Sequence, residues 1–222
     1  AALVAQQHER APRGLSRQGE VVRPVRAGHL RPDLVHEGVL EQAERELLHE
    51  RAPDRLFIAE RDASGAWAGL TYAQARRKVD AVAQALLDRG LSAERPVMAL
   101  SGNAVELAVL MLACYTAGVP IAPISVAYSL QSQDHSKLKY INELLTPGLV
   151  YVSDTGPFAK ALAHITAPVV AGRNSANLPG VTLFADLEKT TPGAAVDKAA
   201  ASICADTIAK FLLTSGSTGN PK

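Results

Sequence analysis

Apolar side chains recur along the chain with two different spacings, and each spacing predicts a different kind of element. After Thr71 they return every three or four residues, which is the spacing of one face of an amphipathic helix. The apolar positions of this helix are Ala75, Val79, Val82 and Leu86. Thr71 is a favourable N-cap residue, and Gly90 favours a helix end just before it, so the sequence marks both ends.

Short, almost entirely apolar runs bounded by turn residues predict buried strands. We predict strands at residues 96–100, 119–124, 149–152, 169–170, 181–184 and 207–213, and a hairpin formed by 56–59 and 67–70. Further helices are predicted at 37–50, 104–117, 134–145, 158–165 and 196–203. Strands that alternate with helices form βαβ units. The sequence therefore predicts an α/β fold, with a layered, mainly parallel sheet and helices on both faces.

The composition is that of an ordinary folded protein. Hydrophobic residues make up 47% of the 222 positions and charged residues 20%, which argues against wholesale disorder. A net charge of +1 gives no global reason to expect nucleic acid or an anionic membrane as a partner. Two cysteines are too few for a disulfide scaffold or a zinc site, and they favour a reducing compartment. We therefore expect a cytoplasmic protein.

The first 31 residues are more basic than the rest of the chain. Residues 1–31 contain six arginines and two glutamates and show little hydrophobic periodicity. We expect this basic arm to be poorly ordered or to lie on the surface, and residues 32–222 to form one α/β unit. The arm could bind an anionic partner, or it could serve only as a solubilising end.

The longest uncharged stretch, residues 107–133, raises the question of a membrane helix. Gly118, Pro120 and Pro123 interrupt it and leave only residues 107–117 as a helix, well short of the roughly 20 residues that cross a bilayer. The first residues also lack the charged region and the long apolar run of a secretory signal. We expect a buried helix and a buried strand here, and no membrane partner.

The last residues carry the strongest chemical signal of the chain. A strand-like segment, 210–213, leads into the block Thr214, Ser215, Gly216, Ser217, Thr218, Gly219, Asn220, Pro221 and Lys222. Glycines let the backbone approach a phosphate and direct successive N–H groups at it. The four hydroxyl groups are further donors, and Lys222 adds a positive charge. The block suits the β- and γ-phosphates of a nucleotide, although it does not fit the Walker pattern G-x-x-x-x-G-K-[ST].

This block resembles the ATP-phosphate loop of the adenylate-forming superfamily, which includes acyl-CoA synthetases, firefly luciferase and the adenylation domains of peptide synthetases. The superfamily pattern is Thr-Ser-Gly-Ser/Thr-Thr-Gly-x-Pro-Lys, and residues 214–222 match it throughout. Residues 70–72 resemble its first core motif and residues 117–124 its second, so the resemblance covers roughly residues 33–222. It implies the N-terminal portion of the acyl-CoA synthetase-like large domain.

Four further segments are similar to feruloyl-CoA synthetases, which are bacterial acid–thiol ligases acting on hydroxycinnamates. These segments are residues 52–61, 100–103, 128–138 and 144–150. This closer resemblance implies that the acid substrate is a hydroxycinnamic acid such as ferulate.

The resemblance implies a reaction in two steps. A carboxylate attacks the α-phosphate of ATP and gives an acyl-adenylate and pyrophosphate, and the thiol of CoA then displaces AMP. ATP, Mg²⁺ and CoA are implied as cofactors or co-substrates. The residues implied to hold the leaving pyrophosphate are Thr214, Ser215, Gly216, Ser217, Thr218, Gly219 and Lys222. No catalytic residue and no metal ligand is implied within this chain.

In the superfamily, the adenine and ribose contacts, the hinge and the catalytic lysine lie downstream of the phosphate loop. Because the sequence stops at Lys222, we expect an N-terminal fragment that is inactive by itself and binds ATP weakly or not at all. One alternative is another adenylate-forming ligase, acting on a fatty acid or a different aryl acid. The other is a non-catalytic, truncated chain that serves only in association. A homo-oligomer is compatible with each of these readings.

Other side chains suggest chemistry that their surroundings do not support. Asp134 and His135 are neighbours in sequence, but adjacent residues of a helix do not face each other, so we expect no catalytic dyad. His164 is expected to be exposed or hydrogen-bonded. Cys114 lies on an apolar helix and is expected to be part of the core, and Cys204 has no histidine nearby to activate it.

Overall fold

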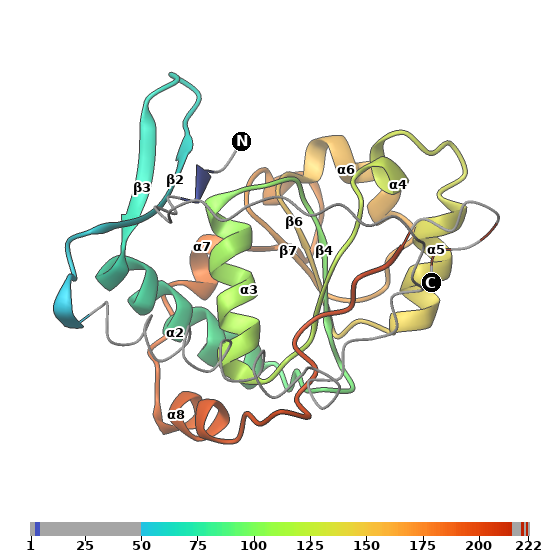
Figure 1. The fold of residues 1–222 in the computed structure, drawn as a ribbon. Helices are drawn as coiled ribbons and strands as arrows, with labels where there is room; N and C mark the ends of the chain where they lie inside the picture. The colour runs from blue at the N-terminus through green and yellow to red at the C-terminus, as the bar shows by residue number, and fades with distance from the viewer. Residues whose placement is uncertain (1–2, 5–49, 215–218, 220, 222) are drawn as a thin grey trace, which may run out of the picture.

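A parallel sheet forms the centre of the part of the chain that the computed structural model describes, which is residues 3–4, 50–214, 219 and 221 (Figure 1). Its five strands follow the order β5-β4-β6-β7-β8. They are β4 (Val97–Leu100), β5 (Ile121–Pro123), β6 (Leu149–Val152), β7 (Val169–Ala171) and β8 (Thr182–Leu183). Each neighbouring pair is parallel, which confirms the predicted α/β class.

A smaller antiparallel sheet has the order β1-β2-β3. It consists of β1 (Leu3–Val4), β2 (Leu56–Arg61) and β3 (Trp67–Thr71). The predicted hairpin is confirmed and projects away from the main sheet (Figure 1). Its turn is held by Asp62, whose Oδ1 accepts hydrogen bonds from the N–H groups of Ser64 and Ala66. Apart from Leu3–Val4, the predicted basic arm 1–31 lies outside the described residues.

Helices follow most strands. They are α2 (Tyr72–Asp88), α3 (Val105–Ala117), α4 (Ala127–Leu130), α5 (Ser136–Leu145), α6 (Thr155–Leu162), α7 (Phe184–Leu187) and α8 (Ala194–Ala201), with a 3-10 turn, η2, at Ser175–Asn177. Of the helix predicted at 37–50, only the last residue is described. Thr71 caps α2 as predicted, since its hydroxyl accepts from the N–H of Gln74 and the Gln74 side chain accepts from the N–H of Thr71.

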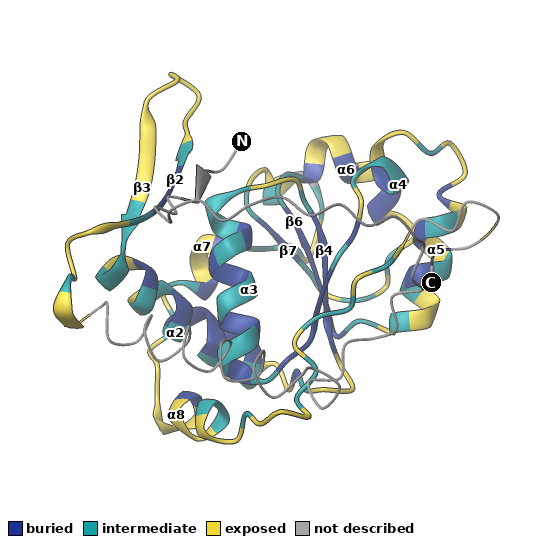
Figure 2. Ribbon diagram, viewed as in Figure 1, coloured by how far each residue is buried: buried dark blue, intermediate teal, exposed yellow. Residues whose placement is uncertain are grey.

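Both faces of the parallel sheet are buried, as the continuous apolar runs predict. In β4, Val97 and Ala99 point into a core shared with α2 and α3, whereas Met98 and Leu100 point into a second core shared with α5 and α6. In Figure 2 the central strands β4 and β6 are dark blue along their length, α5 and α6 show exposed residues on their outer sides, and α3 is only buried or half-buried. The layers predicted from the sequence are therefore present.

The strand predicted at 207–213 is wrong, because only Lys210 pairs, in an isolated parallel bridge with Ile121. The N–H of Ile121 donates to the Ala209 carbonyl, and the N–H of Phe211 donates to the Ile121 carbonyl. The next donor on this side of β5 would be the N–H of Pro123, and proline has none. The ladder stops after one residue for this reason.

Three predicted boundaries also shift. The helix predicted from 158 begins at Thr155, because the Asp154 side chain caps it and Pro157 is tolerated in a first turn. The helix predicted from 196 begins at Ala194, directly after Gly193. Phe184, predicted to end a strand, begins α7 instead.

Candidate functional site

The predicted phosphate loop lies largely outside the described residues. Of its seven predicted contact residues, the structure describes Thr214 and Gly219, and both are exposed. A Cβ on Gly219 would meet nothing within 4 Å, as expected of an exposed residue. Ser215, Gly216, Ser217, Thr218 and Lys222 are not described. The assignment of these residues to phosphate binding stays a prediction.

Residues 210–214, which lead into this loop, are described, and they show in which direction the chain leaves the sheet. Because Lys210 pairs in parallel with Ile121 of β5, the chain after it runs toward the carboxyl ends of the strands (Figure 1). Phe211 and Leu213 pack against the core beneath α5 and α6, and Leu212 is exposed between them. Thr214 therefore leaves the sheet at its carboxyl edge.

The same edge contains the switch point of the sheet. From β4 the chain moves outward to β5 and then crosses to β6 on the other side of β4, so the connections after these strands diverge. In open α/β sheets, ligands bind outside the carboxyl ends of the strands at such a point. The candidate site is therefore the carboxyl edge of β4 and β6, and the predicted loop approaches it.

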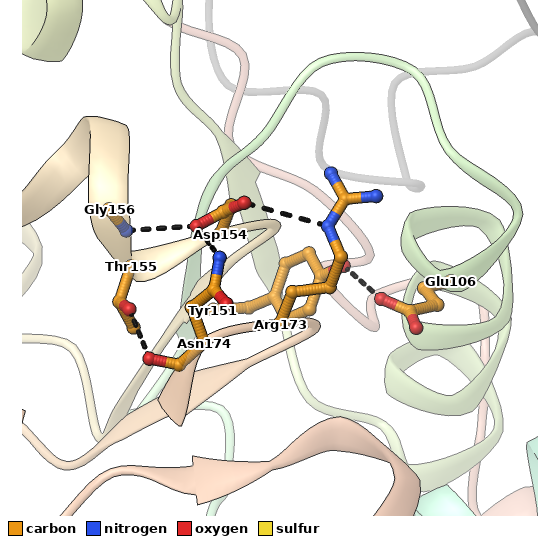
Figure 3. Close-up of polar contacts among 7 residues, drawn as sticks. All are labelled: Glu106, Tyr151, Asp154, Thr155, Gly156, Arg173 and Asn174. Atoms are coloured by element: carbon orange, nitrogen blue, oxygen red, sulfur yellow. Dashed lines mark hydrogen bonds and ion pairs between the residues drawn. The ribbon is translucent and has the colours of Figure 1, made fainter. Parts of the chain in front are cut away.

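Polar side chains from distant parts of the sequence meet at this edge (Figure 3). The hydroxyl of Tyr151, on β6, donates to Glu106 Oε2 in the first turn of α3, with 2.9 Å between the oxygens. The carboxylate of Glu60, on β2, accepts a hydrogen bond from the N–H of Val105. Burial raises the pKa of Tyr151 well above its ordinary value, and the neighbouring Glu106 carboxylate adds to this. The phenol is thus held as a donor.

A second group of contacts joins the loops after β6 and β7 (Figure 3). Asp154 Oδ1 accepts from the side-chain amide of Asn174 and from the N–H of Gly156, each at 2.9 Å. Arg173 Nε lies 3.6 Å from the other oxygen of Asp154. The Asn174 amide and the Gly156 N–H lower the pKa of Asp154, so this carboxylate is ionised at neutral pH.

The sequence analysis did not single out the residues of these two groups. A signal was available, because Asp154 follows the apolar run of β6, and Arg173 and Asn174 follow that of β7. Polar residues directly after parallel strands lie at the carboxyl edge. Their mutual hydrogen bonds join the loops that follow β6 and β7 and tie β6 to the start of α3.

Asp134 and His135 precede α5, which begins at Ser136 and not at the predicted residue 134, and their described contacts are with other residues. Asp134 Oδ1 accepts from Ser132 and from the N–H of Ser136. His135 is buried, its Nε2 lies 3.2 Å from the Ser129 carbonyl oxygen, and its ring packs 5.2 Å from that of the exposed His164. These contacts fix the start of α5.

Cys114 is part of the core, as predicted. Cys114 is fully buried in the core between α3 and the sheet, and burial raises the pKa of its thiol far above the ordinary value. Cys204 is exposed, and its closest described partner is the hydroxyl of Thr207. No histidine contact activates either thiol among the described interactions.

A family model described as AMP-binding enzyme matches residues 45–222, which is well over half of the chain. The chain belongs to the AMP-binding enzyme family. The match includes every strand of the parallel sheet and the predicted phosphate loop. Among curated proteins, none matches the chain significantly.

Solved structures of ligases share the fold of this AMP-binding protein. The fatty acyl-adenylate ligase from L. pneumophila, solved with acyl adenylate and pyrophosphate, is 21% identical with a TM-score of 0.56, over 80% of this chain and 28% of that one. A benzoate CoA ligase from Burkholderia xenovorans LB400 is 20% identical with a TM-score of 0.60, over 77% of this chain and 32% of that one. MbtA of Mycobacterium smegmatis is 21% identical, also with a TM-score of 0.60, over 80% of this chain and 32% of that one.

The chain thus spans about a third of the length of these structures, 28% and 32% in the first two. Sequence identities near 20% show that the folds are similar. The activities are those of the matched proteins and are not assigned to this chain. None of the helices described here is long and apolar enough to cross a membrane. Within the same residues, no group of three or more His, Cys, Asp or Glu side chains is arranged to hold a metal ion.

Proposed function

We propose that this AMP-binding protein is the N-terminal part of an ATP-dependent acid–CoA ligase that adenylates a hydroxycinnamic acid such as ferulate. The single observation that carries the proposal is the parallel pairing of Lys210 with Ile121. It directs a segment with a nucleotide-phosphate sequence toward the edge of the sheet where α/β proteins bind ligands.

In the proposed first step, a carboxylate oxygen of the acid attacks the α-phosphorus of ATP. The bond from that phosphorus to the bridging oxygen breaks, and pyrophosphate leaves. Backbone N–H groups, the four hydroxyls and Lys222 would neutralise the charge of the departing phosphates. In the second step, the thiol of CoA attacks the acyl carbon, loses its proton and displaces AMP.

Mg²⁺ would supply further neutralisation of phosphate charge. The Thr214 hydroxyl is an oxygen donor of the kind that Mg²⁺ accepts. Because the described residues offer no carboxylate cage, we propose that the phosphates of ATP provide most of the ligands. A place in the cytoplasm and a homo-oligomer stay predictions.

The choice of ferulate rests on residues 52–61, 100–103, 128–138 and 144–150, which are similar to feruloyl-CoA synthetases. Residues 100–103 leave the carboxyl end of β4 and residues 128–138 lead into α5, so these two segments lie toward the candidate site. Residues 52–61 cover β2, and residues 144–150 lead into the amino end of β6 at the opposite edge of the sheet. The benzoate CoA ligase among the structural neighbours is compatible with an aryl acid, and the fatty acyl-adenylate ligase keeps fatty acids as the competing class.

ATP–pyrophosphate exchange tests the proposal on this chain extended through its own downstream coding sequence. We expect exchange to be stimulated more by ferulate than by benzoate or by a long-chain fatty acid. Lys222→Ala should reduce exchange with every acid, because the loop contacts phosphate and not the acid. Stimulation by the fatty acid alone would contradict the choice of substrate, and exchange unaffected by Lys222→Ala would contradict the role of the loop.

A further inference from the structure

A cavity of about 310 Å³ lies against the C-terminal half of α3, whereas the Tyr151–Glu106 contact of Figure 3 involves the first turn of that helix. It is enclosed by one face of α2, the C-terminal half of α3, α8 and the segment after α8, and Phe57 of β2 adds to its wall. In Figure 1, α8 lies beneath α2 and the lower end of α3, and the three helices are in contact. None of the residues predicted to bind phosphate lines it.

The walls of this cavity, which we call the α2–α8 cavity, are mostly apolar and aromatic. Ala75, Val79 and Val196 contribute buried aliphatic groups. Phe57 and Tyr72 lie against each other, with ring centroids 5.1 Å apart and planes inclined at 51°. Tyr115, on α3, adds a third aromatic ring to the lining. Such a lining favours a flat ring that can pack against other rings.

The polar groups of the lining indicate a neutral ligand. Arg76 is engaged by Asp80, with 2.7 Å between Nε and the carboxylate oxygen, and Asp197 is exposed on α8. Lys210 Nζ lies 5.7 Å from the centroid of the Tyr115 ring but is not part of the lining. A charged ligand inside the cavity would therefore lose its hydration without contacting an unengaged opposite charge of the lining, which is costly in an apolar site. The hydroxyls of Tyr72 and Tyr115 form none of the described hydrogen bonds, so they remain available to a ligand oxygen.

The size of the cavity sets the scale of the ligand. A cavity of about 150 Å³ is enough to hold benzene. The α2–α8 cavity is about twice as large, at 310 Å³. It can accommodate one ring with short substituents, and a nucleotide or a long acyl chain would have to extend beyond it.

We propose that the α2–α8 cavity is a binding site for a small, neutral, monocyclic aromatic molecule that carries a hydrogen-bonding oxygen. The ring would pack between Phe57, Tyr72 and Tyr115, and the oxygen would exchange hydrogen bonds with the tyrosine hydroxyls. This site is distinct from the carboxyl edge of the sheet, where the predicted phosphate loop approaches.

Fluorine NMR on the 222-residue chain tests this directly, with 4-fluorophenol as the probe. We expect saturable binding with a dissociation constant of about 1 mM or below, and at least tenfold weaker binding of 4-fluorobenzoate, which is charged. Absence of saturable binding overturns the proposal, including the case in which another part of the chain already fills the cavity. Equal or tighter binding of 4-fluorobenzoate overturns the preference for a neutral ligand.

Two matched variants locate the probe. Ala200 lines the cavity on α8, so Ala200→Trp should fill it and abolish binding, whereas Ala195→Trp, at an exposed position of the same helix outside the lining, should leave binding unchanged. Circular dichroism of both variants checks that they are folded. Binding that survives Ala200→Trp in a folded protein overturns the proposed location.

A gentler substitution addresses the hydrogen bonds without filling the cavity. In the double variant Tyr72→Phe/Tyr115→Phe, we expect 4-fluorophenol to bind about three- to tenfold more weakly and fluorobenzene to bind as before. An equal effect on both probes, or no effect on either, contradicts the role of the hydroxyls.

Cys204 provides an independent readout, because it lines the cavity and is exposed while Cys114 is fully buried. Saturating 4-fluorophenol should slow alkylation of Cys204 by iodoacetamide at least twofold, as measured by mass spectrometry of the intact chain. An unchanged alkylation rate at saturation contradicts binding next to this residue.

Discussion

The hydroxyl of Tyr151 donates a 2.9 Å hydrogen bond to Glu106, and this bond joins the carboxyl end of β6 to the first turn of α3. The two residues are 45 positions apart in sequence. Tyr151 is fully buried, and its ring packs edge-on against Phe184. The bond therefore fixes the geometry of the candidate site from inside the core, and its removal has measurable consequences.

Tyr151→Phe should lower the free energy of unfolding by about 1–3 kcal/mol, because it leaves the part-buried Glu106 carboxylate without this donor while keeping the ring. Urea denaturation at pH 7 measures the change. Tyr140→Phe is the matched control, since the Tyr140 ring is part-buried and its hydroxyl forms none of the described hydrogen bonds. Equal effects of the two substitutions would contradict the importance of the Glu106 contact.

Alkaline pH should destabilise the wild-type chain more steeply than Tyr151→Phe. Burial raises the pKa of folded Tyr151 above its unfolded value of 10.0, so only the unfolded state ionises as the pH rises past that value. The contribution of Tyr151 to the free energy of unfolding is therefore complete below pH 10. Above pH 10 it declines by up to about 1.4 kcal/mol per pH unit. Denaturation curves between pH 9 and 11 measure the two slopes, and parallel slopes would exclude this linkage.

Gly172→Ala should destabilise the fold by about 1–3 kcal/mol through overpacking. A Cβ at this position would collide with Glu106 Oε2 and approach the Ser153 carbonyl oxygen to 2.8 Å. Gly102→Ala is the control, because a Cβ there would meet nothing within 4 Å, and we expect a change of no more than about 0.5 kcal/mol. Thermal denaturation compares the two. A neutral Gly172→Ala would mean that Glu106 can move without cost.

Thr71→Ala should cost about 1 kcal/mol, because it removes the side-chain half of the capping box at the start of α2. Urea denaturation again provides the measurement. Thr166→Ala, at an exposed position between α6 and β7, should be nearly neutral. If both substitutions had the same effect, the cap would contribute nothing to stability.

Calorimetric titration of the 222-residue chain with Mg-ATP should show no micromolar site. The resemblance implies that adenine and ribose are contacted by segments downstream of the phosphate loop. This chain could therefore hold ATP only through its phosphates, and we expect weak binding. Lys222→Ala should leave the titration unchanged within error. A micromolar site in the wild-type chain would contradict the expectation that it is an inactive fragment.

Local sequence predicted most elements because their signals are local. The Thr71 cap and the apolar face from Ala75 to Leu86 identified α2 within a residue or two. The predicted helix 158–165 begins too late, because the Asp154 cap allows Gly156 and Pro157 to form the first turn of α6. The strand predicted at 207–213 failed for a different reason, because its pairing depends on Pro123, more than 80 residues earlier.

By itself, the sequence determined the alternation of strands and helices, the burial of the sheet on both faces and the chemical character of residues 214–222. Only the tertiary structure decided the strand order β5-β4-β6-β7-β8, the meeting of Glu106 with Tyr151, and the α2–α8 cavity. The reason is physical. Periodicity and capping act within one or two helical turns, whereas strand order and the contacts of buried polar groups depend on packing between segments far apart in the chain.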